Sequence, residues 1–230
     1  MRKVLVTGST GAIGEACAAQ FHDAGYFVYL HYRSQESKVK ELNQKLPNSQ
    51  IIQFDISKKE EVYSALENLE VDVLVNNAGI TKDALFFFME DDDWSSVIDT
   101  SVNGTYYVTK ALIRNMISNK KGSIVNVASI SGLIGNAGQT NYSAAKGAMI
   151  AFTKALSMEL GRYKIRVNAV APGIVESEMT KDLDLKEMKK LIPLKRIGKP
   201  EDIAECVFFL GDKASYVTGE VLNISGGKAR

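Results

Sequence analysis

The fold of this 230-residue chain is decided by the stretch K-V-L-V-T-G-S-T-G-A-I-G, which runs from Lys3 to Gly14. Its first five residues predict a short buried strand, its glycines predict a tight turn, and residues 15–24 predict a helix. A strand, a glycine-rich turn and a helix in this order form the context that a dinucleotide-binding motif requires. Glycines let the backbone approach a pyrophosphate, and the start of the helix offers it unpaired N–H groups. The spacing here is G-x-x-G-x-x-G, wider at its start than the G-x-G-x-x-G of many dehydrogenases.

Apolar strands alternate with helices along the rest of the chain. Six further runs rich in valine, isoleucine and leucine predict strands at residues 27–31, 50–54, 71–75, 123–127, 165–170 and 221–224. Helical stretches lie between them, at residues 36–46, 60–69, 93–118, 142–163 and 200–210. Strands separated by helices imply parallel βαβ units with right-handed crossovers. The sequence therefore predicts an α/β fold, with a doubly wound, seven-stranded parallel sheet and helices on both faces.

Length and composition fit a single domain, residues 1–230, with neither a nucleic-acid nor a membrane partner. The chain contains 28 basic and 27 acidic residues, so electrostatics gives no reason to expect either partner. No apolar run could span a bilayer, and Met1 leads almost directly into the first strand. We therefore expect no signal peptide and a cytoplasmic protein, in which Cys17 and Cys206 are small buried thiols. We expect the acidic run at residues 90–93 to open a helix rather than to bind a metal, and we predict no metal site.

Tyr142 and Lys146 stand four residues apart in N-Y-S-A-A-K, a spacing that places both side chains on one face of a helix. A free tyrosine has a pKa of about 10, and a nearby ammonium lowers that pKa toward neutral pH. A general acid is most useful when its pKa lies near the operating pH. An isolated pair at this spacing is more often an ordinary surface pair. Here the dinucleotide-binding turn in the same chain favours a catalytic role.

The order of several motifs identifies a family resemblance that covers the chain essentially from end to end. The motifs are Thr7-Gly8 with Gly11 and Gly14, Asn76-Asn77-Ala78-Gly79, Ser129, Tyr142 with Lys146, and Pro172-Gly173. With them the chain resembles the short-chain dehydrogenase/reductase family, which implies a Rossmann-like fold and an oxidoreductase. Within that family it is most similar to the 3-oxoacyl-[acyl-carrier-protein] reductases of fatty acid synthesis, through residues 76–83, 135–146, 171–180 and 216–227.

The resemblance implies a catalytic set of Ser129, Tyr142, Lys146 and Asn103. Ser129 follows the fifth strand, where its hydroxyl can steady the substrate carbonyl as negative charge develops on the oxygen. Tyr142 would deliver a proton to that oxygen, while Lys146 would lower the tyrosine pKa and hydrogen-bond the nicotinamide ribose. Asn103 would hold a water that links Lys146 to solvent. The alternative for Asn103 is a helix-interior asparagine that satisfies its own backbone.

The end of the second strand favours NADPH as the cofactor. NAD enzymes usually place a carboxylate there for the ribose 2′-OH, whereas this chain has Arg33 and Ser34, with no carboxylate before Glu36. An arginine would pair with a 2′-phosphate. Two observations leave alternatives open: Thr10 stands where many NADP-preferring relatives carry a basic residue, and Arg33 could be a solvated surface residue. The cofactor-binding residues that we predict are Gly8, Ser9, Thr10, Gly11, Ile13, Gly14, Arg33, Ser34, Asp55, Ile56, Asn77, Ala78, Gly79, Tyr142, Lys146, Pro172, Gly173 and Ile174.

Asp55 and Ile56 follow the third strand and match the family's adenine-contacting position. The alternative for Asp55 is a simple cap of the next helix. Residues 174–198 correspond to the relatives' mobile lid over the substrate, which closes after the cofactor binds. An acyl carrier protein is acidic and would need basic partners. Lys120 matches one basic docking position of the relatives, whereas a second such position falls on Tyr163.

The resemblance also implies a homo-oligomer, a tetramer as in the relatives, in which the two long helices pack against their copies across a two-fold axis. Apolar residues extend more than halfway round each helix, so a lone subunit would expose a sizeable apolar patch. Coverage by neighbouring helices of the same subunit is the alternative. The residues concerned are Tyr106, Tyr107, Ala111 and Ile113 on the first helix, and Met149, Phe152, Ala155, Leu156 and Met158 on the second.

Two other functions stay open at this point. One is an NAD(P)H-dependent reductase that acts on another ketone, on a 3-oxoacyl-CoA or on a polyketide-type chain. The other is a non-catalytic protein that binds a dinucleotide to sense redox state. A sensor is expected to have lost serine, tyrosine or lysine from the catalytic set, and this chain keeps all three. The sequence decides neither the acyl length nor the carrier.

Overall fold

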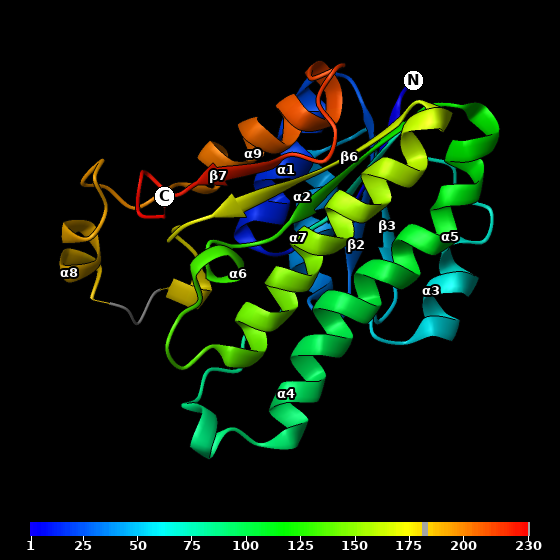
Figure 1. Ribbon diagram of the computed structural model, residues 1–230. Coiled ribbons are helices and arrows are strands. Elements are labelled where there is room, and N and C mark those ends of the chain that lie inside the picture. Colours follow the sequence, from blue (N-terminus) through cyan, green and yellow to red (C-terminus); the bar gives the residue numbers. More distant parts are fainter. Residues whose placement is uncertain (181–183, 230) are drawn as a thin grey trace.

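The computed structural model describes residues 1–180 and 184–229 and shows one parallel sheet of seven strands (Figure 1). The strand order is β3-β2-β1-β4-β5-β6-β7, and every pair of neighbours is parallel. The predicted doubly wound sheet is therefore confirmed. The strands are β1 (Lys3–Val6), β2 (Phe27–Tyr32), β3 (Ser49–Gln53), β4 (Val73–Asn76), β5 (Gly122–Val127), β6 (Ile165–Pro172) and β7 (Val221–Ile224).

Alternate residues of the central strand enter two separate cores, one on each face of the sheet. Val4 and Val6 pack with the apolar sides of α1 (Ala12–Asp23), α2 (Glu36–Lys45) and α9 (Pro200–Phe208). Leu5 points the other way, into the core that the opposite helices cover. Because both faces of the strand are buried, its sequence is continuously apolar rather than alternating.

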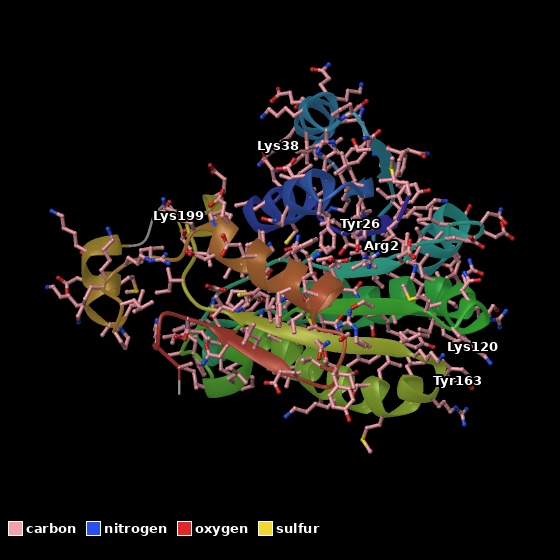
Figure 2. All side chains as sticks on the ribbon, turned by 90° about the horizontal axis from the view of Figure 1, so that it is seen from above. Arg2, Tyr26, Lys38, Lys120, Tyr163 and Lys199 are labelled. Atoms are coloured by element: carbon pink, nitrogen blue, oxygen red, sulfur yellow. The ribbon has the colours of Figure 1, made fainter. Side chains whose placement is uncertain are left out.

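The second core lies under α3 (Lys59–Leu66), α5 (Gly104–Asn119) and α7 (Thr140–Leu160). Figure 2 shows the resulting layers from above, with α1 and α9 on one side of the sheet and α7 on the other. All seven strands and these six helices were predicted, and most of their ends differ by only one to three residues from the expected ones. The short helix α6 (Ser131–Ile134) lies between β5 and α7 and was not predicted.

One predicted helix, residues 93–118, is divided into three segments. It comprises α4 (Asp91–Ile98), a π-helical turn (Asp99–Asn103) and α5. The acidic run opens α4 as expected, with Asp91, Asp92 and Asp93 in its first turn. The π-helical turn widens the helix by one residue, which changes the direction in which its side chains point. At its end Gly104 lies so close to Ile56 that a Cβ there would be 2.6 Å from the Cγ1 atom of that isoleucine.

The chain between β6 and α9 departs from the sheet and returns to it. Its two ends are joined by hydrogen bonds from Gly198 N to Ile174 O and from Glu176 N to Gly198 O, both 2.9 Å long. Between them the short helix α8 (Leu185–Lys190) stands apart from the body of the protein (Figure 1). Asp184 caps α8 by accepting from two backbone N–H groups. Residues 181–183 of the predicted lid lie outside the described part of the chain. Within that part, no helix is long and apolar enough to cross a membrane.

Candidate active site

The carboxyl ends of the central strands bring together nearly all of the predicted site residues. After β1 the chain winds toward β2 and β3, whereas β4 lies on the other side of β1. Such a reversal of strand order is a topological switch point, where open α/β sheets bind their ligands. Asn77, Ser129 and Gly173 follow strands β4, β5 and β6 at this same edge.

The glycine turn after β1 fits a pyrophosphate. Gly8 has a φ of +64°, a left-handed conformation that favours glycine. A Cβ at Gly8 would lie 2.9 Å from the Cα of Ala78, and a Cβ at Gly14 would overlap the carbonyl oxygen of Gly8. Gly11 is the N-cap of α1, and no side chain of the described residues caps this helix. The first N–H groups of α1 are therefore open to an anion, as a dinucleotide site needs.

The Asn76-Asn77-Ala78-Gly79 segment supports this turn from the β4 side. The hydroxyl oxygen of Thr7 accepts hydrogen bonds from Asn77 N at 2.9 Å and Ala78 N at 3.0 Å. In return, the Asn77 Nδ2 atom donates to Thr7 O at 2.9 Å and to Gly8 O at 3.1 Å. These bonds explain why threonine and asparagine occur in the two motifs: together they fix the backbone path on which the glycines lie.

His31 supports the same turn from the β2 side and was not predicted. Its Nδ1 atom lies 2.9 Å from Gly8 N, and its Nε2 atom lies 3.0 Å from Phe54 O. Burial lowers the pKa of His31 to about 4, although its contact with the Phe54 carbonyl and the charge of Asp55 act in the opposite direction. A lone histidine in an apolar strand gives no sequence signal of this role, because its partners come from β1 and β3.

The predicted 2′-phosphate and adenine contacts lie side by side at the ends of β2 and β3. Arg33 and Ser34 are exposed there, and Arg33 lies near enough for its charge to act on Asp55. Burial raises the pKa of Asp55, but hydrogen bonds from Ser57 and the charge of Arg33 lower it below its ordinary value overall. Asp55 closes a local turn by accepting from Ser57 N and Ser57 Oγ. It does not cap α3, whose N-cap is Lys58.

Tyr142 and Lys146 lie on one face of α7 as predicted, with Tyr142 in its first turn. The Nζ atom of Lys146 is 5.6 Å from the centre of the Tyr142 ring. It donates to Val127 O at 2.7 Å and lies 3.5 Å from the sulfur of Met149. Ser129 is close enough to hydrogen-bond the Tyr142 hydroxyl. The structure thus brings three of the four predicted catalytic residues together.

Burial controls the ionisation of both residues in the cofactor-free protein. It raises the pKa of Tyr142 to about 12, against a lowering by the hydrogen bond to Ser129. It also lowers the pKa of Lys146 to about 8. From the sequence we expected a lowered tyrosine pKa, and the structure shows the opposite, because burial outweighs the hydrogen bond to Ser129 and the Lys146 ammonium donates to the Val127 carbonyl. Tyr142 is consequently a fully protonated phenol at neutral pH, the state from which it can donate a proton.

The fourth predicted catalytic residue, Asn103, is not joined to the other three by any hydrogen bond of the described residues. Its Nδ2 atom donates to the Asp99 carboxylate at 2.7 Å, on the exposed side of the π-helical turn. Two residues earlier, Ser101 is fully buried, and its hydroxyl has no hydrogen-bond partner among the described residues. A Cβ built on Gly79 would lie 3.5 Å from Lys146 Nζ and 3.6 Å from Ser101 Oγ. Ser101 therefore lies close to Lys146, in the place where we expected Asn103.

Pro172, Gly173 and Ile174 complete this edge of the sheet. Pro172 ends β6 and its carbonyl accepts from Ile130 N at 3.0 Å, which connects it to the loop that carries Ser129. Gly173 packs against Ser225, and a Cβ at this glycine would lie 2.8 Å from the Cα of that serine. The predicted cofactor residues after β6 are thus adjacent to the catalytic loop.

Comparison with known proteins identifies the family. Residues 8–229 match the protein family described as "Enoyl-(Acyl carrier protein) reductase". The chain belongs to the short-chain dehydrogenase/reductase family. Its fold, its glycine turn and the grouping of Ser129, Tyr142 and Lys146 agree with this membership, which confirms the family resemblance of the sequence.

Three curated relatives match almost the whole of the chain. It is 42% identical to "3-oxoacyl-[acyl-carrier-protein] reductase FabG" of Chlamydia trachomatis over 241 residues, covering 99% of this chain and 97% of the relative. It is 41% identical to the protein of the same name from Thermotoga maritima over 235 residues, covering 97% and 96%. It is also 41% identical to "Nodulation protein G" of Rhizobium meliloti over 238 residues, covering 99% and 97%.

Proposed function

We propose that this enzyme uses NADPH to reduce a 3-oxoacyl thioester, carried on acyl carrier protein, to the 3-hydroxyacyl thioester in fatty acid or related acyl-chain biosynthesis. The observation that carries the proposal is the grouping of Ser129, Tyr142 and Lys146 beside the glycine turn. A sensor that only binds dinucleotide has no need of this grouping. The two relatives named as 3-oxoacyl-[acyl-carrier-protein] reductases support the choice of substrate.

The reaction assigns a different task to each side chain. The Ser129 hydroxyl donates a hydrogen bond to the ketone oxygen and stabilises the negative charge that develops there. The Tyr142 phenol, held next to Ser129, transfers its proton to that oxygen. When bound, NADPH supplies the hydride that reduces the ketone carbon. Lys146 lies one helical turn beyond Tyr142 and returns a proton toward the phenolate, which a lysine with a pKa of about 8 can do near neutral pH.

The proton that Lys146 returns has to reach it from solvent. Asn103 was the sequence candidate for holding a relay water, but its side chain is bonded to Asp99. Ser101 fits the task better, because its buried hydroxyl is free and lies across Gly79 from the ammonium. The two atoms are not hydrogen-bonded to each other, and their distances of 3.5 and 3.6 Å from the Cβ position of Gly79 place them no more than about 7 Å apart, a separation that ordered water can span.

The two variants Ser101→Ala and Asn103→Ala distinguish these candidates. We expect Ser101→Ala to lower kcat about tenfold, with little change in the KM for NADPH, whereas Asn103→Ala should stay within about threefold of the wild type. If kcat fell only in Asn103→Ala, Asn103 and not Ser101 would be the residue that holds the relay water. Solvent isotope effects on kcat provide a second readout, because they increase only if proton return has become slower.

The proposed docking positions for the carrier lie at the opposite edge of the sheet from the catalytic residues. Lys120 lies two residues before Gly122, at the amino end of β5, and Tyr163 lies two residues before Ile165, at the amino end of β6. Gly122 and Ile165 are paired in the sheet, so the two positions lie at the same edge. Figure 2 shows both side chains at the same corner of the molecule. β5 alone contains six residues, which corresponds to about 20 Å between the two edges. A carrier bound at this corner would therefore serve the active site of another subunit.

The proposed oligomer supplies that second active site. Tyr106 on α5 is 45% exposed and Met158 on α7 is 86% exposed, so both helices present large apolar side chains to the outside. A two-fold axis that crosses these helices pairs them with antiparallel copies. The amino edge of one sheet then lies beside the carboxyl edge of its partner's sheet. Light scattering at dilute protein concentration tests this arrangement, and a fully active monomer would exclude it.

Residues 174–198 are our proposal for a substrate lid. Leu191 and Leu194 are 59% and 65% exposed, and so provide apolar surface that an acyl chain could cover. The joined ends of the segment, Ile174 and Gly198, suit a flap that moves as a unit. We further propose a cytoplasmic location, which is consistent with the free state of both cysteines, Cys17 and Cys206.

A substrate panel tests the proposed function directly. NADPH oxidation would be followed with matched 3-oxoacyl thioesters of acyl carrier protein and of CoA, with a free 3-oxo ester, and with a 2-enoyl thioester. We expect the acyl-carrier-protein ketone to give the highest kcat/KM. Preference for the CoA thioester or the free ketone would support another ketoreductase. Preference for the enoyl substrate would show that the enzyme reduces carbon–carbon double bonds, as the description of the matched family says.

A further inference from the structure

His31 holds the glycine turn through a hydrogen bond that requires an unprotonated nitrogen. The side chain is buried, with 2% of its surface exposed. A backbone carbonyl can only accept, so the Nε2 atom, 3.0 Å from Phe54 O, carries the ring proton. The Nδ1 atom is then the acceptor for the Gly8 N–H group at 2.9 Å. The imidazole is thus neutral, and both of its nitrogens are in use.

The backbone of the same residue holds the next position of the turn. His31 O accepts from Ser9 N at 2.9 Å and from Ser9 Oγ at 3.0 Å. On the far side of the turn, Asn77 donates to Gly8 O at 3.1 Å. The peptide groups on both sides of Gly8 are therefore fixed. The φ of Gly8, +64°, determines where the chain enters the open N-terminus of α1.

His31 also connects the glycine turn to the two other segments that are predicted to contact the cofactor. Its ring packs against Phe54, with 4.0 Å between the ring centres, and Phe54 directly precedes Asp55. Arg33 lies two residues after His31, directly beyond the end of β2. The His31 ring therefore connects the segments predicted to contact the pyrophosphate and the adenine, and the chain continues from His31 to the predicted 2′-phosphate contact.

We propose that neutral His31 is a positioning residue for the cofactor: by accepting from Gly8 N–H, it fixes the turn in the shape that binds the pyrophosphate of NADPH. It touches neither the substrate nor the reacting atoms. Losing the acceptor should therefore weaken cofactor binding and leave kcat at saturating NADPH unchanged. The inference rests on the dinucleotide site alone, so it stands whichever ketone the enzyme reduces.

The surroundings keep this acceptor unprotonated at neutral pH. Burial lowers the pKa of His31 to about 4. Gly8 and Ser9 approach the ring from β1 and are uncharged. From the end of β3, Phe54 contributes a carbonyl and Asp55 a carboxylate, and these favour the protonated ring without offsetting burial. Protonation would place a hydrogen on Nδ1, where it would face the Gly8 N–H group.

Two uncharged substitutions separate the two hydrogen bonds of the ring. In His31→Asn, the Oδ1 atom replaces Nδ1 as the acceptor for Gly8, and the donor to Phe54 is lost. In His31→Gln, the Nε2 atom keeps the donor to Phe54, and the acceptor for Gly8 is lost. We expect His31→Gln to raise the Kd for NADPH about tenfold or more, since a buried N–H group is left unpaired, and His31→Asn to stay within about threefold of the wild type. Kd would be measured by the fluorescence of bound NADPH.

A purely structural role for His31 predicts a different result. Both variants would then melt at a lower temperature in the cofactor-free state, while their folded forms would bind NADPH equally well. Equal weakening by both variants, or by neither, would overturn the proposal. If neither variant folds, a measurement on the wild-type protein still tests the proposal. Nitrogen-15 NMR of the cofactor-free enzyme must show an unprotonated Nδ1 on His31 at neutral pH, with His22→Asn used to assign the signals of the chain's two histidines. A protonated Nδ1 would refute the proposal.

Discussion

The two halves of the site differ in how well their buried polar groups are paired. On the cofactor side, Thr7, His31 and Asn77 use their side-chain donors and acceptors to hold the glycine turn. On the catalytic side, Ser101 and Ser143 have buried hydroxyls without a hydrogen-bond partner in the part of the chain that the structure describes. A buried polar group that has a hydrogen-bond partner is held rigidly and costs little stability. A buried polar group without a partner lowers the stability of the fold by about 1–3 kcal/mol.

This contrast shows which half is complete before the ligands arrive. The glycine turn already has its binding shape, so little further ordering is needed when a pyrophosphate enters. The catalytic half contains a buried ammonium, Lys146, that has one carbonyl and one thioether as partners. Its unused hydrogen-bonding capacity is available to a ribose, a water or a substrate. Enzymes commonly give up stability at such positions in exchange for activity.

Removing the proton donor should produce the largest effect. Tyr142→Phe keeps the ring and its packing but removes the hydroxyl that transfers the proton. We expect kcat to fall by about 10²–10⁴, while the Kd for NADPH stays near its wild-type value. Steady-state kinetics and fluorescence binding measure the two quantities. Tyr216→Phe makes the same chemical change at a fully exposed tyrosine and should leave both unchanged. Near-normal turnover of Tyr142→Phe would show that another group is the acid.

Acid pH should lower the stability of the folded protein through His31, on the cofactor side of the site. His31 has a lowered pKa in the folded protein, so the unfolded chain binds more protons than the folded chain between pH 6.5 and about 4. The free energy of unfolding therefore falls as the pH drops through this window, with His31 contributing on the order of 3 kcal/mol. Urea titrations of the cofactor-free protein at a series of pH values test this. His31→Asn should flatten the dependence, and a slope equal to that of the wild type would contradict the prediction.

A charge reversal at the end of β2 should change the choice of cofactor. Arg33→Asp replaces the proposed 2′-phosphate partner with a like charge. We expect the Kd for NADPH to rise about 10- to 100-fold, with little change for NADH. Lys45→Asp is the matched control, because it makes the same charge change at an exposed residue near the other end of α2. If NADPH and NADH were weakened equally, Arg33 would not be the phosphate partner.

The smallest effect concerns stability on the catalytic side. Lys146→Met removes a buried charge whose pKa is lowered to about 8, and it also leaves Val127 O without its partner. The two changes partly offset each other, so we expect a net gain of about 1 kcal/mol in unfolding free energy at pH 7, together with loss of turnover. The gain should shrink as the pH rises from about 8 to 10.5, because folded Lys146 is then already neutral. Urea melts at pH 7 and pH 10 measure both; a destabilised variant at pH 7 would contradict the expectation.

What the sequence could predict was set by local patterns. Each strand carries its own apolar run and each turn its own glycines, so the sheet and the glycine turn follow from short stretches such as Lys3–Gly14. The four-residue spacing on a helix also indicated Tyr142 and Lys146, whereas Ser129 came from the family resemblance. A local pattern also marks the start of α9 at Pro200, a residue that suits the first turn of a helix.

The features that the sequence did not predict depend on neighbours that are distant in the chain. Ser101 rather than Asn103 faces Lys146 because a π-helical turn alters the direction of the side chains, and no composition signal marks that turn. His31 gains its role only when β1 and β3 lie on either side of β2. The raised pKa of Tyr142 results from burial by surrounding elements, which the four-residue spacing from Lys146 does not reveal.

The strand order has a consequence for how the protein is made. Of the seven strands, β1 is made first and becomes an interior strand of the finished sheet, and β2 and β3 then extend the sheet to one side. β4 pairs with the free side of β1, and β5, β6 and β7 follow it outward one at a time. Each of the strands β2 to β7 therefore leaves the ribosome when one strand with which it pairs has already been made. The sheet can grow in step with translation, and only β4 adds to an older edge, that of β1, instead of to the newest one.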